Sequence, residues 1–500
     1  MLATIHSTVL VGIEALPVQI EVDVSHGLPQ FAMVGLPDIA IRESRDRVRA
    51  AIRNSGFEFP PHRITVNLSP ADVPKAGTSF DLAIAMGLLA TSAQLDPANL
   101  PDTLVLGELS LDGGINPVRG VLATALAARK RGITRVLVPA ANAAEAAAVH
   151  GVRVLPVTSL PQAVQAVTNP ETALVSLPEP PRQAARTAEV DLAEVSGQLL
   201  ARRALEIAAA GSHNLLLVGP PGTGKTMLAR RLGTILPPLV VDEQLEASAV
   251  HSVAGTLRAG SGLLEERPFR APHHTASHIA LIGGGLIPHP GEVTLAHHGV
   301  LFLDECPEFG RRALEALRQP LEEHSVTIAR AARVVTFPAR FLLIAAMNPC
   351  PCGYRGHPTH PCACSPVQVT RYGMRLSGPL LDRIDLTVRL GPIPPDALSA
   401  EPGESSSTVR QRVIEARHRQ RARQHDLGVA VNGDLRGGTV MKAAQATSPA
   451  IALLRRASER LDLSARSHHR VLAVARTVAD LEGHPRVDTQ HLAEALQFRS

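Results

Sequence analysis

The residues Gly219 to Thr226 read GPPGTGKT and match the pattern G-x-x-x-x-G-K-T. A buried-strand pattern, NLLLVG, precedes them and a helical pattern follows, which is the context that a phosphate-binding loop requires. Backbone N–H groups and the positive end of the helix dipole would then attract phosphate oxygens. Lys225 is expected to reach the β- and γ-phosphates of ATP, and Thr226 to bind Mg²⁺. The residues expected to contact the nucleotide are Gly219, Pro220, Pro221, Gly222, Thr223, Gly224, Lys225 and Thr226.

Polar residues follow two further apolar segments that are predicted to be strands. VLFLDE places Asp304 and Glu305 after a buried strand, about 80 residues beyond the phosphate loop. Asp304 is expected to hold Mg²⁺ through water and Glu305 to polarise the attacking water. FLLIAAMNP ends on Asn348, which could orient that water or, alternatively, only form the turn before Pro349.

Strands alternating with helices predict a doubly wound α/β domain with a parallel sheet around these motifs. We expect this core over 191–392, after a mixed α+β domain over 1–168 and before helices over 409–500. The stretches 169–190 and 393–408 are rich in Pro or Ser and are interpreted as linkers.

The composition limits the partners of the chain. The 500 residues include no Trp, two Tyr and ten Phe, which disfavours an aromatic stacking platform for single-stranded nucleic acid. A net charge of +4 neither requires nor excludes a nucleic-acid partner. Lys225 is one of only four lysines, against 46 arginines, as expected where an ammonium group is required. We expect a cytoplasmic protein without a membrane partner, because no signal peptide or long apolar run is present and cysteines are few.

The order GPPGTGKT, LFLDE, AAMNP, GPLLDRID resembles the AAA+ ATPases of the magnesium-chelatase and MCM branch. FRAPHHTAS, PGEVTLAHHGVLFLDECPEF and NPCPCGY are similar to the ComM/YifB family of magnesium-chelatase-like proteins, over essentially the whole chain. The resemblance implies that Arg383 is an arginine finger acting on a neighbouring subunit, in a homohexameric ring. The alternative is a surface pairing with Asp382 or Asp385. Arg466 would be the second nucleotide sensor, with Arg470 as the alternative, in a helical C-terminal lid.

Two insertions fit the same branch. One covers His273–Gly291. The other, Ser325–Phe337, is predicted to be a β-hairpin with Arg330 and Arg333 near its turn. Related hairpins line a central pore and touch DNA, so both arginines are candidate DNA contacts, the alternative being a solvated hairpin. Thr408–Gln424 holds six arginines and is either a solvated lid helix or a DNA-phosphate contact.

The N-terminal domain resembles the proteolytic domain of Lon-type enzymes. Ser79 falls where the nucleophile of a Ser-Lys dyad would lie. Leu122 occupies the position of the Lys base, and Lys75 lies too close in sequence to replace it. We therefore expect a Lon-like fold without protease activity.

The stretch NPCPCGYRGHPTHPCACSP holds Cys350, Cys352, Cys362 and Cys364. Four thiolates that converge in a tight loop suit tetrahedral Zn²⁺, and the alternative is a set of reduced cysteines in a proline-stiffened loop. The paired histidines at 273–274 and 297–298 are interpreted as hydrogen-bonding or pore residues, because neighbours on a strand point to opposite faces.

The function that follows is a hexameric, Mg²⁺-dependent ATP hydrolase that moves on DNA. The family resemblance implies branch migration of branched or single-stranded recombination intermediates during natural transformation. The alternatives are a protein-remodelling ATPase that acts on a partner protein and an ATP-dependent protease, the latter opposed by Leu122.

Overall fold

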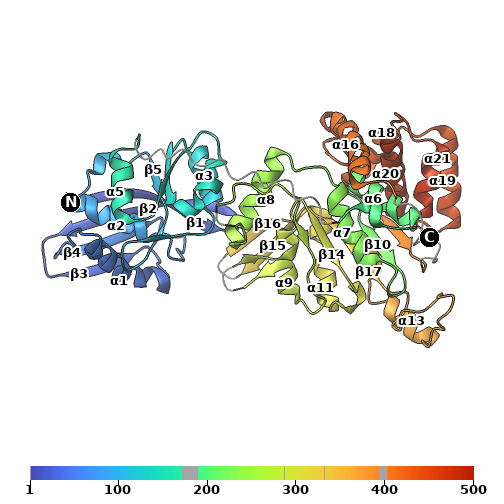
Figure 1. Ribbon diagram of the computed structural model, residues 1–500, viewed down its shortest axis with the longest axis horizontal. Coiled ribbons are helices and arrows are strands. Elements are labelled where there is room, and N and C mark those ends of the chain that lie inside the picture. Colours follow the sequence, from blue (N-terminus) through green and yellow to red (C-terminus); the bar gives the residue numbers. More distant parts are fainter. Residues whose placement is uncertain are drawn as a thin grey trace. The chain divides into compact units, whose positions relative to one another are not determined.

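The computed structural model describes residues 2–171, 190–258, 260–285, 288–330, 333–392 and 403–499, with Arg330 and Arg333 described by their backbone. The chain divides into two compact units, one formed by Met1–Ala184 with Gln244–Leu264 and the other by Ala185–Glu243 with Glu265–Ser500. Figure 1 shows the elements of each unit, coloured along the sequence. Residues 172–189 and 393–402, which make up most of the two predicted linkers, lie outside the described residues. The predicted domain limits therefore stay predictions.

Seven strands form one mixed sheet in the first unit, in the order β3-β4-β2-β1-β5-β8-β9. β1 and β2 pair antiparallel, as do β2 and β4, while the other neighbours run parallel. Along β4 the residues Ile64, Val66 and Leu68 are buried, because alternate side chains of a strand share one face. The strands are β1 (Leu2–Val11), β2 (Glu14–Ser25), β3 (Gln30–Val34), β4 (Arg63–Ser69), β5 (Thr103–Val105), β8 (Arg135–Pro139) and β9 (Arg153–Val157), with β6 (Glu108–Leu109) and β7 (Ile115–Asn116) as a separate pair.

Helix α2 is buried at the centre of this unit. It contacts β1 and β2, and all its residues are buried. A Cβ at Gly87 would lie 2.6 Å from Val22 Cγ2 and 2.7 Å from Ile5 Cδ1, so only glycine allows this close approach of helix and sheet. The described helices before the gap are α1 (Ile39–Asn54), α2 (Asp81–Thr91), α3 (Val121–Lys130), α4 (Ala143–Ala147) and α5 (Leu160–Thr168).

The second unit contains the predicted parallel sheet. Its strand order is β11-β14-β17-β10-β18, and every neighbouring pair is parallel. β14 and β17 are buried along their whole length, as expected for parallel strands covered on both faces. The mixed α/β fold with a parallel sheet is thereby confirmed. The strands are β10 (Leu215–Val218), β11 (Phe269–Arg270), β14 (Val300–Leu303), β17 (Leu342–Met347) and β18 (Leu386–Arg389).

The helices after residue 403 share one apolar core with this sheet. A single cluster of buried residues includes Leu217 of β10, Ala208 of α6, Val413 of α16 and Val474 of α20. The helices of this unit outside the insertions are α6 (Leu199–Gly211), α7 (Lys225–Ile235), α10 (Glu292–Leu295), α11 (Arg311–Ala316), α12 (Pro320–Glu323), α13 (Pro366–Gly373), α14 (Gly378–Leu381), α16 (Ser406–Ala422), α17 (Gln424–Leu427), α18 (Gly438–Ala444), α19 (Ser448–Arg460), α20 (Ala465–Leu481) and α21 (Thr489–Gln497).

Both predicted insertions contain regular structure. The first holds α9 (His278–Ile282) and the paired strands β12 (Gly283–Gly284) and β13 (His289–Pro290). The second is an antiparallel hairpin of β15 (Ser325–Arg330) and β16 (Arg333–Pro338). Val326, Ile328, Val335 and Phe337 of the hairpin are buried, so its base is anchored in the unit.

The segment Gln244–Leu264 groups with the N-terminal unit, although the sequence pattern placed it within 191–392. It includes most of α8 (Val241–Ala254). Ala249 joins an apolar cluster with Leu122, and Ser252 Oγ donates to Glu145 Oε2 at 2.5 Å. Periodicity predicts that a helix has a buried face but not the sheet on which it packs.

Among the described residues, no helix is long and apolar enough to cross a bilayer.

Candidate nucleotide-binding site

The phosphate-loop motif joins β10 to α7. Gly222 and Gly224 have φ angles of +79° and +83°, conformations that residues with a Cβ rarely adopt. Gly219 has no space for a side chain, because a Cβ there would lie 2.9 Å from the Leu390 carbonyl oxygen. Glycine at these three positions therefore allows the backbone path of the loop.

Lys225 is the first residue of α7. Its Nζ donates to the carbonyl oxygens of Gly219 at 2.7 Å and Pro220 at 2.8 Å, and to Asn348 Oδ1 at 3.1 Å. Burial lowers the pKa of Lys225, while Asp304 and Glu305 raise it. The ammonium group thus lies against the loop, with carbonyl acceptors that phosphate oxygens can replace.

The strand-end residues meet the loop at one edge of the sheet. Thr226 Oγ1 donates to Asp304 Oδ2 at 2.6 Å, while Asn348 contacts Lys225. Hydroxyl and carboxylate oxygens are the hard ligands that Mg²⁺ prefers, so Thr226 and Asp304 fit this ion. The structure therefore brings four predicted site residues into two neighbouring hydrogen-bonded pairs.

Glu305 faces a pocket beside these pairs. The pocket is lined in part by Thr226, Arg230 and His274, and Glu305 Oε2 lies 3.4 Å from His274 Nδ1. The sequence predicts only hydrogen-bonding or pore roles for the pair His273 and His274, and this proximity to Glu305 is an additional finding. The doubled histidine in FRAPHHTAS was the available signal.

Arg383 and Arg466, which the resemblance assigns to the nucleotide, both pair with Glu322. Arg383 Nη2 lies 2.6 Å from Glu322 Oε2, and Arg383 is only 5% exposed. Burial lowers the pKa of Arg383. The alternative partners expected from the sequence are Asp382 and Asp385, whereas Arg383 pairs with Glu322 on α12, which no motif indicates.

Arg470, the alternative to Arg466, donates to Asp385. The backbone N–H of Asn214 donates to the second carboxylate oxygen at 3.0 Å. Burial by itself would raise the pKa of Asp385, but Arg470 and His213 lower it below its ordinary range. Arg470 is therefore half of a buried ion pair between α20 and the start of β18.

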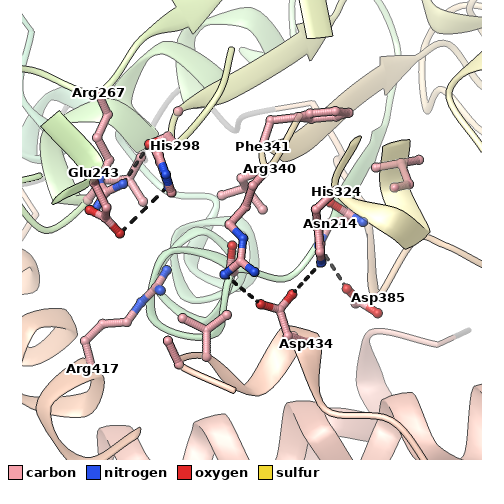
Figure 2. A pocket seen from close by; sticks show the side chains of 18 of the residues that line it. Asn214, Glu243, Arg267, His298, His324, Arg340, Phe341, Asp385, Arg417 and Asp434 are labelled. Atoms are coloured by element: carbon pink, nitrogen blue, oxygen red, sulfur yellow. Dashed lines mark hydrogen bonds and ion pairs between the residues drawn. The ribbon is translucent and has the colours of Figure 1, made fainter. Parts of the chain in front are cut away.

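Arg470 and Asp385 help to line the polar pocket of Figure 2. In this pocket Asp434 pairs with His324 at 3.1 Å and with Arg340 at 3.2 Å. Arg417 of α16 also lines it and donates to the Ala209 carbonyl oxygen at 2.8 Å, and burial lowers its pKa to about 9.

Three more arginines of the basic stretch Thr408–Gln424 make contacts within the chain. Arg412 pairs with Glu206, while Arg419 and Arg423 bind Asp480. These arginines therefore have partners within the chain, and a DNA-phosphate contact by this helix stays a prediction. In the hairpin, the strand register places Arg330 opposite Arg333, and their proposed DNA contact stays a prediction.

The protease-like residues lie in the N-terminal unit. Leu122 is fully buried in an apolar cluster, and its N–H donates to Glu145 Oε2 at 3.3 Å. Ser79 precedes α2, and its carbonyl oxygen accepts from the Gly107 N–H at 3.0 Å. Lys75 is buried, and its Nζ donates to the Pro70 carbonyl oxygen. Because a leucine side chain accepts no proton, lack of protease activity stays our prediction.

The four predicted zinc ligands lie together. The sulfur atoms of Cys350, Cys352, Cys362 and Cys364 are all within 4.8 Å of one another. Cys306 is separate and buried, and burial raises the pKa of its thiol to about 12.

Comparison with known protein families gives three matches along the chain. Residues 191–398 match the family described as magnesium chelatase, subunit ChlI. Residues 20–142 match subunit ChlI of Mg-chelatase, and residues 403–499 match the C-terminal part of magnesium chelatase subunit ChlI. The first match contains the phosphate loop, the acidic pair, Asn348 and Arg383.

Some individual proteins are similar to this chain over its whole length. The protein YifB of Salmonella typhimurium is 47% identical over 100% of this chain and 97% of its own length. Competence protein ComM of Haemophilus influenzae is 44% identical, with the same two coverages. A Lon protease of Chloroflexus aurantiacus is 30% identical over 25% of this chain and 16% of its own length. Identity of this degree over full length confirms the resemblance: the chain belongs to the YifB/ComM family of magnesium-chelatase-like AAA+ ATPases.

Proposed function

We propose that this chain is an ATP-hydrolysing DNA motor that works as a homohexameric ring and drives branch migration of recombination intermediates in natural transformation. The observation that carries the proposal is the meeting of Lys225, Thr226, Asp304 and Asn348 at the ends of three parallel strands. The relative ComM is named for competence, which supports a role in the processing of incoming DNA.

The residues at the sheet edge divide the chemistry among them. Mg²⁺, held by Thr226 and Asp304, would neutralise charge on the β- and γ-phosphates. Lys225 would exchange its carbonyl acceptors for phosphate oxygens. Glu305 would polarise the attacking water, and Asn348 would orient it. Glu305 lines the same pocket as Thr226 and Asp304, which is consistent with this role.

Completion of the site would require a second subunit. Arg383 would reach the nucleotide of a neighbour and stabilise the negative charge of the transition state. Within one chain Glu322 neutralises Arg383, so assembly would have to replace this partner by the phosphate. ATP turnover would then depend on ring formation.

The DNA would contact the hairpin formed by β15 and β16, through Arg330 and Arg333. A protein-remodelling ATPase would share the phosphate chemistry but would need no DNA. The response of ATP turnover to DNA therefore distinguishes the DNA motor from the protein-remodelling ATPase.

The test is strand displacement from labelled three-stranded and four-stranded junctions, with and without ATP, together with ATP turnover with and without the same DNA. We expect ATP-dependent displacement and faster turnover when junctions are present. A Lys225→Ala variant serves as the inactive control. Turnover that does not respond to DNA, with no strand displaced, would refute the motor and favour the remodelling alternative.

A further inference from the structure

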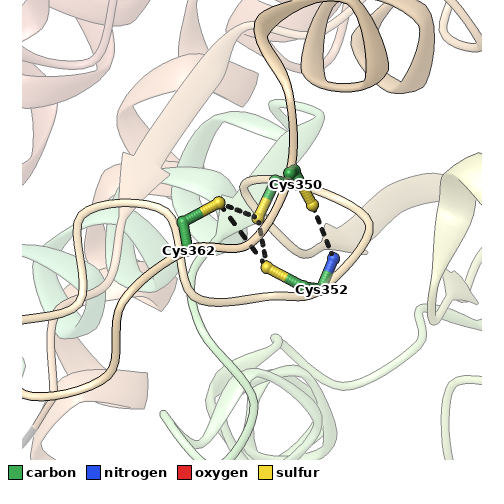
Figure 3. Close-up of side chains that lie close together, drawn as sticks. Cys350, Cys352 and Cys362 are labelled. Carbon is green, nitrogen blue, oxygen red and sulfur yellow. Dashed lines mark hydrogen bonds between the residues drawn. The ribbon is translucent and has the colours of Figure 1, made fainter.

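Four cysteines flank a loop that starts at the candidate nucleotide site. Cys350 and Cys352 come after Asn348 and Pro349, which follow β17, and Cys362 and Cys364 precede α13. Figure 3 shows Cys350, Cys352 and Cys362 turned toward one another. Their sulfur atoms are 3.4 Å apart for Cys350 and Cys352, and 3.6 Å apart from each of these to Cys362.

These separations suit a shared metal ion better than a disulfide. An S–S bond measures about 2.05 Å, far shorter than any of the three distances. Zn–S bonds of about 2.3 Å place the sulfurs of a regular tetrahedron about 3.8 Å apart. A small outward movement of each thiolate would therefore make room for one ion. In an iron–sulfur cluster the four thiolates are divided among two or four irons, which places some of their sulfurs farther apart than the four sulfurs here, all within 4.8 Å of one another.

The backbone also provides the outer contacts of a thiolate site. The N–H of Cys352 donates to Cys364 Sγ at 3.4 Å, and the N–H of Arg355 donates to Cys350 Sγ at 3.3 Å. Such donors orient the sulfurs and stabilise their negative charge in metal sites. His357 and His360 contact each other and Tyr354, so the candidate ligand set is four sulfurs.

We propose that Cys350, Cys352, Cys362 and Cys364 bind one structural Zn²⁺ ion, and that this ion fixes the loop against the phosphate loop. Asn348, two residues before the first ligand, contacts Lys225. Gly353 lies directly on Pro221 of the phosphate loop, because a Cβ there would be 2.7 Å from Pro221 Cδ. The zinc site thus supports the position of both the Asn348 amide and the loop backbone.

Zinc content is the first measurement, and it is independent of ATP chemistry. Full-length protein purified without added chelator should contain about one zinc per chain by elemental analysis, and Co²⁺ exchanged into the site should give the visible bands of a tetrahedral thiolate complex. A Cys362→Ser, Cys364→Ser double variant should lose both signals. The matched control is Cys306→Ala, which removes a thiol outside the cluster and should keep the zinc. A wild-type protein that holds no zinc even after incubation with Zn²⁺, iron in place of zinc, or zinc retained by the double variant would overturn the proposal.

The second measurement concerns the support of the phosphate loop and rests on the proposed ATP site. Zinc-free double variant and wild type are compared for binding of a fluorescent ATP analogue and for melting temperature. We expect nucleotide affinity to fall at least tenfold in the double variant, with a lower melting temperature, and Cys306→Ala to bind as the wild type does. If zinc is bound but its loss leaves nucleotide affinity unchanged, the supporting role is wrong while the zinc site stands. If the wild type binds zinc but no nucleotide, the proposed ATP site fails instead.

Discussion

Arg383 and Glu322 form an ion pair within one chain, with Nη2 and Oε2 2.6 Å apart. We predict that Arg383→Ala leaves ATP binding unchanged and lowers turnover by about 10³-fold or more, because a finger acts on the transition state in a neighbouring subunit. Turnover and binding of an ATP analogue are measured on assembled protein. Arg312→Ala, an exposed arginine of α11, is the control and should turn over normally.

The pairing with Glu322 also predicts the behaviour of a second variant. Glu322→Gln leaves Arg383 and Arg466 without their shared carboxylate. We expect turnover to keep or exceed the wild-type rate when the protein is assembled, since both arginines are then free to bind phosphate. A loss of turnover equal to that of Arg383→Ala would show instead that the ion pair positions the finger.

The strand-end residues can be predicted from the sequence, whereas the partners of the arginines cannot. A buried apolar run followed by a polar residue indicates a parallel strand and its carboxyl edge, so Asp304 and Asn348 can be assigned from the sequence alone. Glu322 and His274 belong to no periodic pattern, and their contacts depend on how loops and short helices pack. The same limit explains why α8 packs in a different unit from the one that the sequence pattern indicates: amphipathicity shows that a face is buried but not against what.

The lysine of the phosphate loop provides the most direct test of the ATP site. Lys225→Ala should abolish ATP turnover and weaken nucleotide binding, because no other ammonium group contacts the loop among the described residues. Lys442→Ala changes an exposed lysine of α18 and should have neither effect. Nucleotide binding is followed by fluorescence titration. Turnover at the wild-type rate in Lys225→Ala would contradict the assignment of Lys225 to phosphate binding.

The N-terminal unit should have no proteolytic activity. Leu122 fills an apolar cluster at the position where a Ser-Lys dyad needs its base. We expect casein to remain intact after incubation with protein and ATP, and Ser79→Ala to behave as the wild type does. Degradation that disappears in Ser79→Ala would contradict this prediction and identify a different base.

Asp385 should stabilise the second unit through its pair with Arg470. Asp385→Asn leaves a buried guanidinium without its counter-charge, which we expect to cost about 3–5 kcal/mol of unfolding free energy. Asp426→Asn, at an exposed site, should change stability by less than about 0.5 kcal/mol. Both changes in the free energy of unfolding are to be measured by urea unfolding.

The carboxylate of Asp385 should also make the stability of the folded chain depend on pH. The pKa of Asp385 in the folded chain is lowered, so its contribution is complete above the unfolded pKa of about 3.9 and is lost as the pH falls toward the folded value. The stability difference between wild type and Asp385→Asn should therefore shrink on acidification below about pH 4. A difference that stays constant well below pH 4 would mean that the asparagine disturbs packing rather than charge.

The hairpin arginines should determine how strongly DNA binding responds to salt. Replacing a phosphate-binding arginine reduces the slope of log K against log[salt] by about 0.7–0.9 for each phosphate that is no longer neutralised. We predict that Arg330→Ala, Arg333→Ala weakens junction binding and reduces this slope, while ATP turnover without DNA is unchanged because the phosphate loop is intact. The control is Arg455→Ala, Arg456→Ala, which removes two exposed arginines from α19. Fluorescence anisotropy over a series of salt concentrations gives both slopes. If the α19 variant reduces the slope as much as the hairpin variant does, the contribution is general surface charge, and the hairpin has no special role in DNA binding.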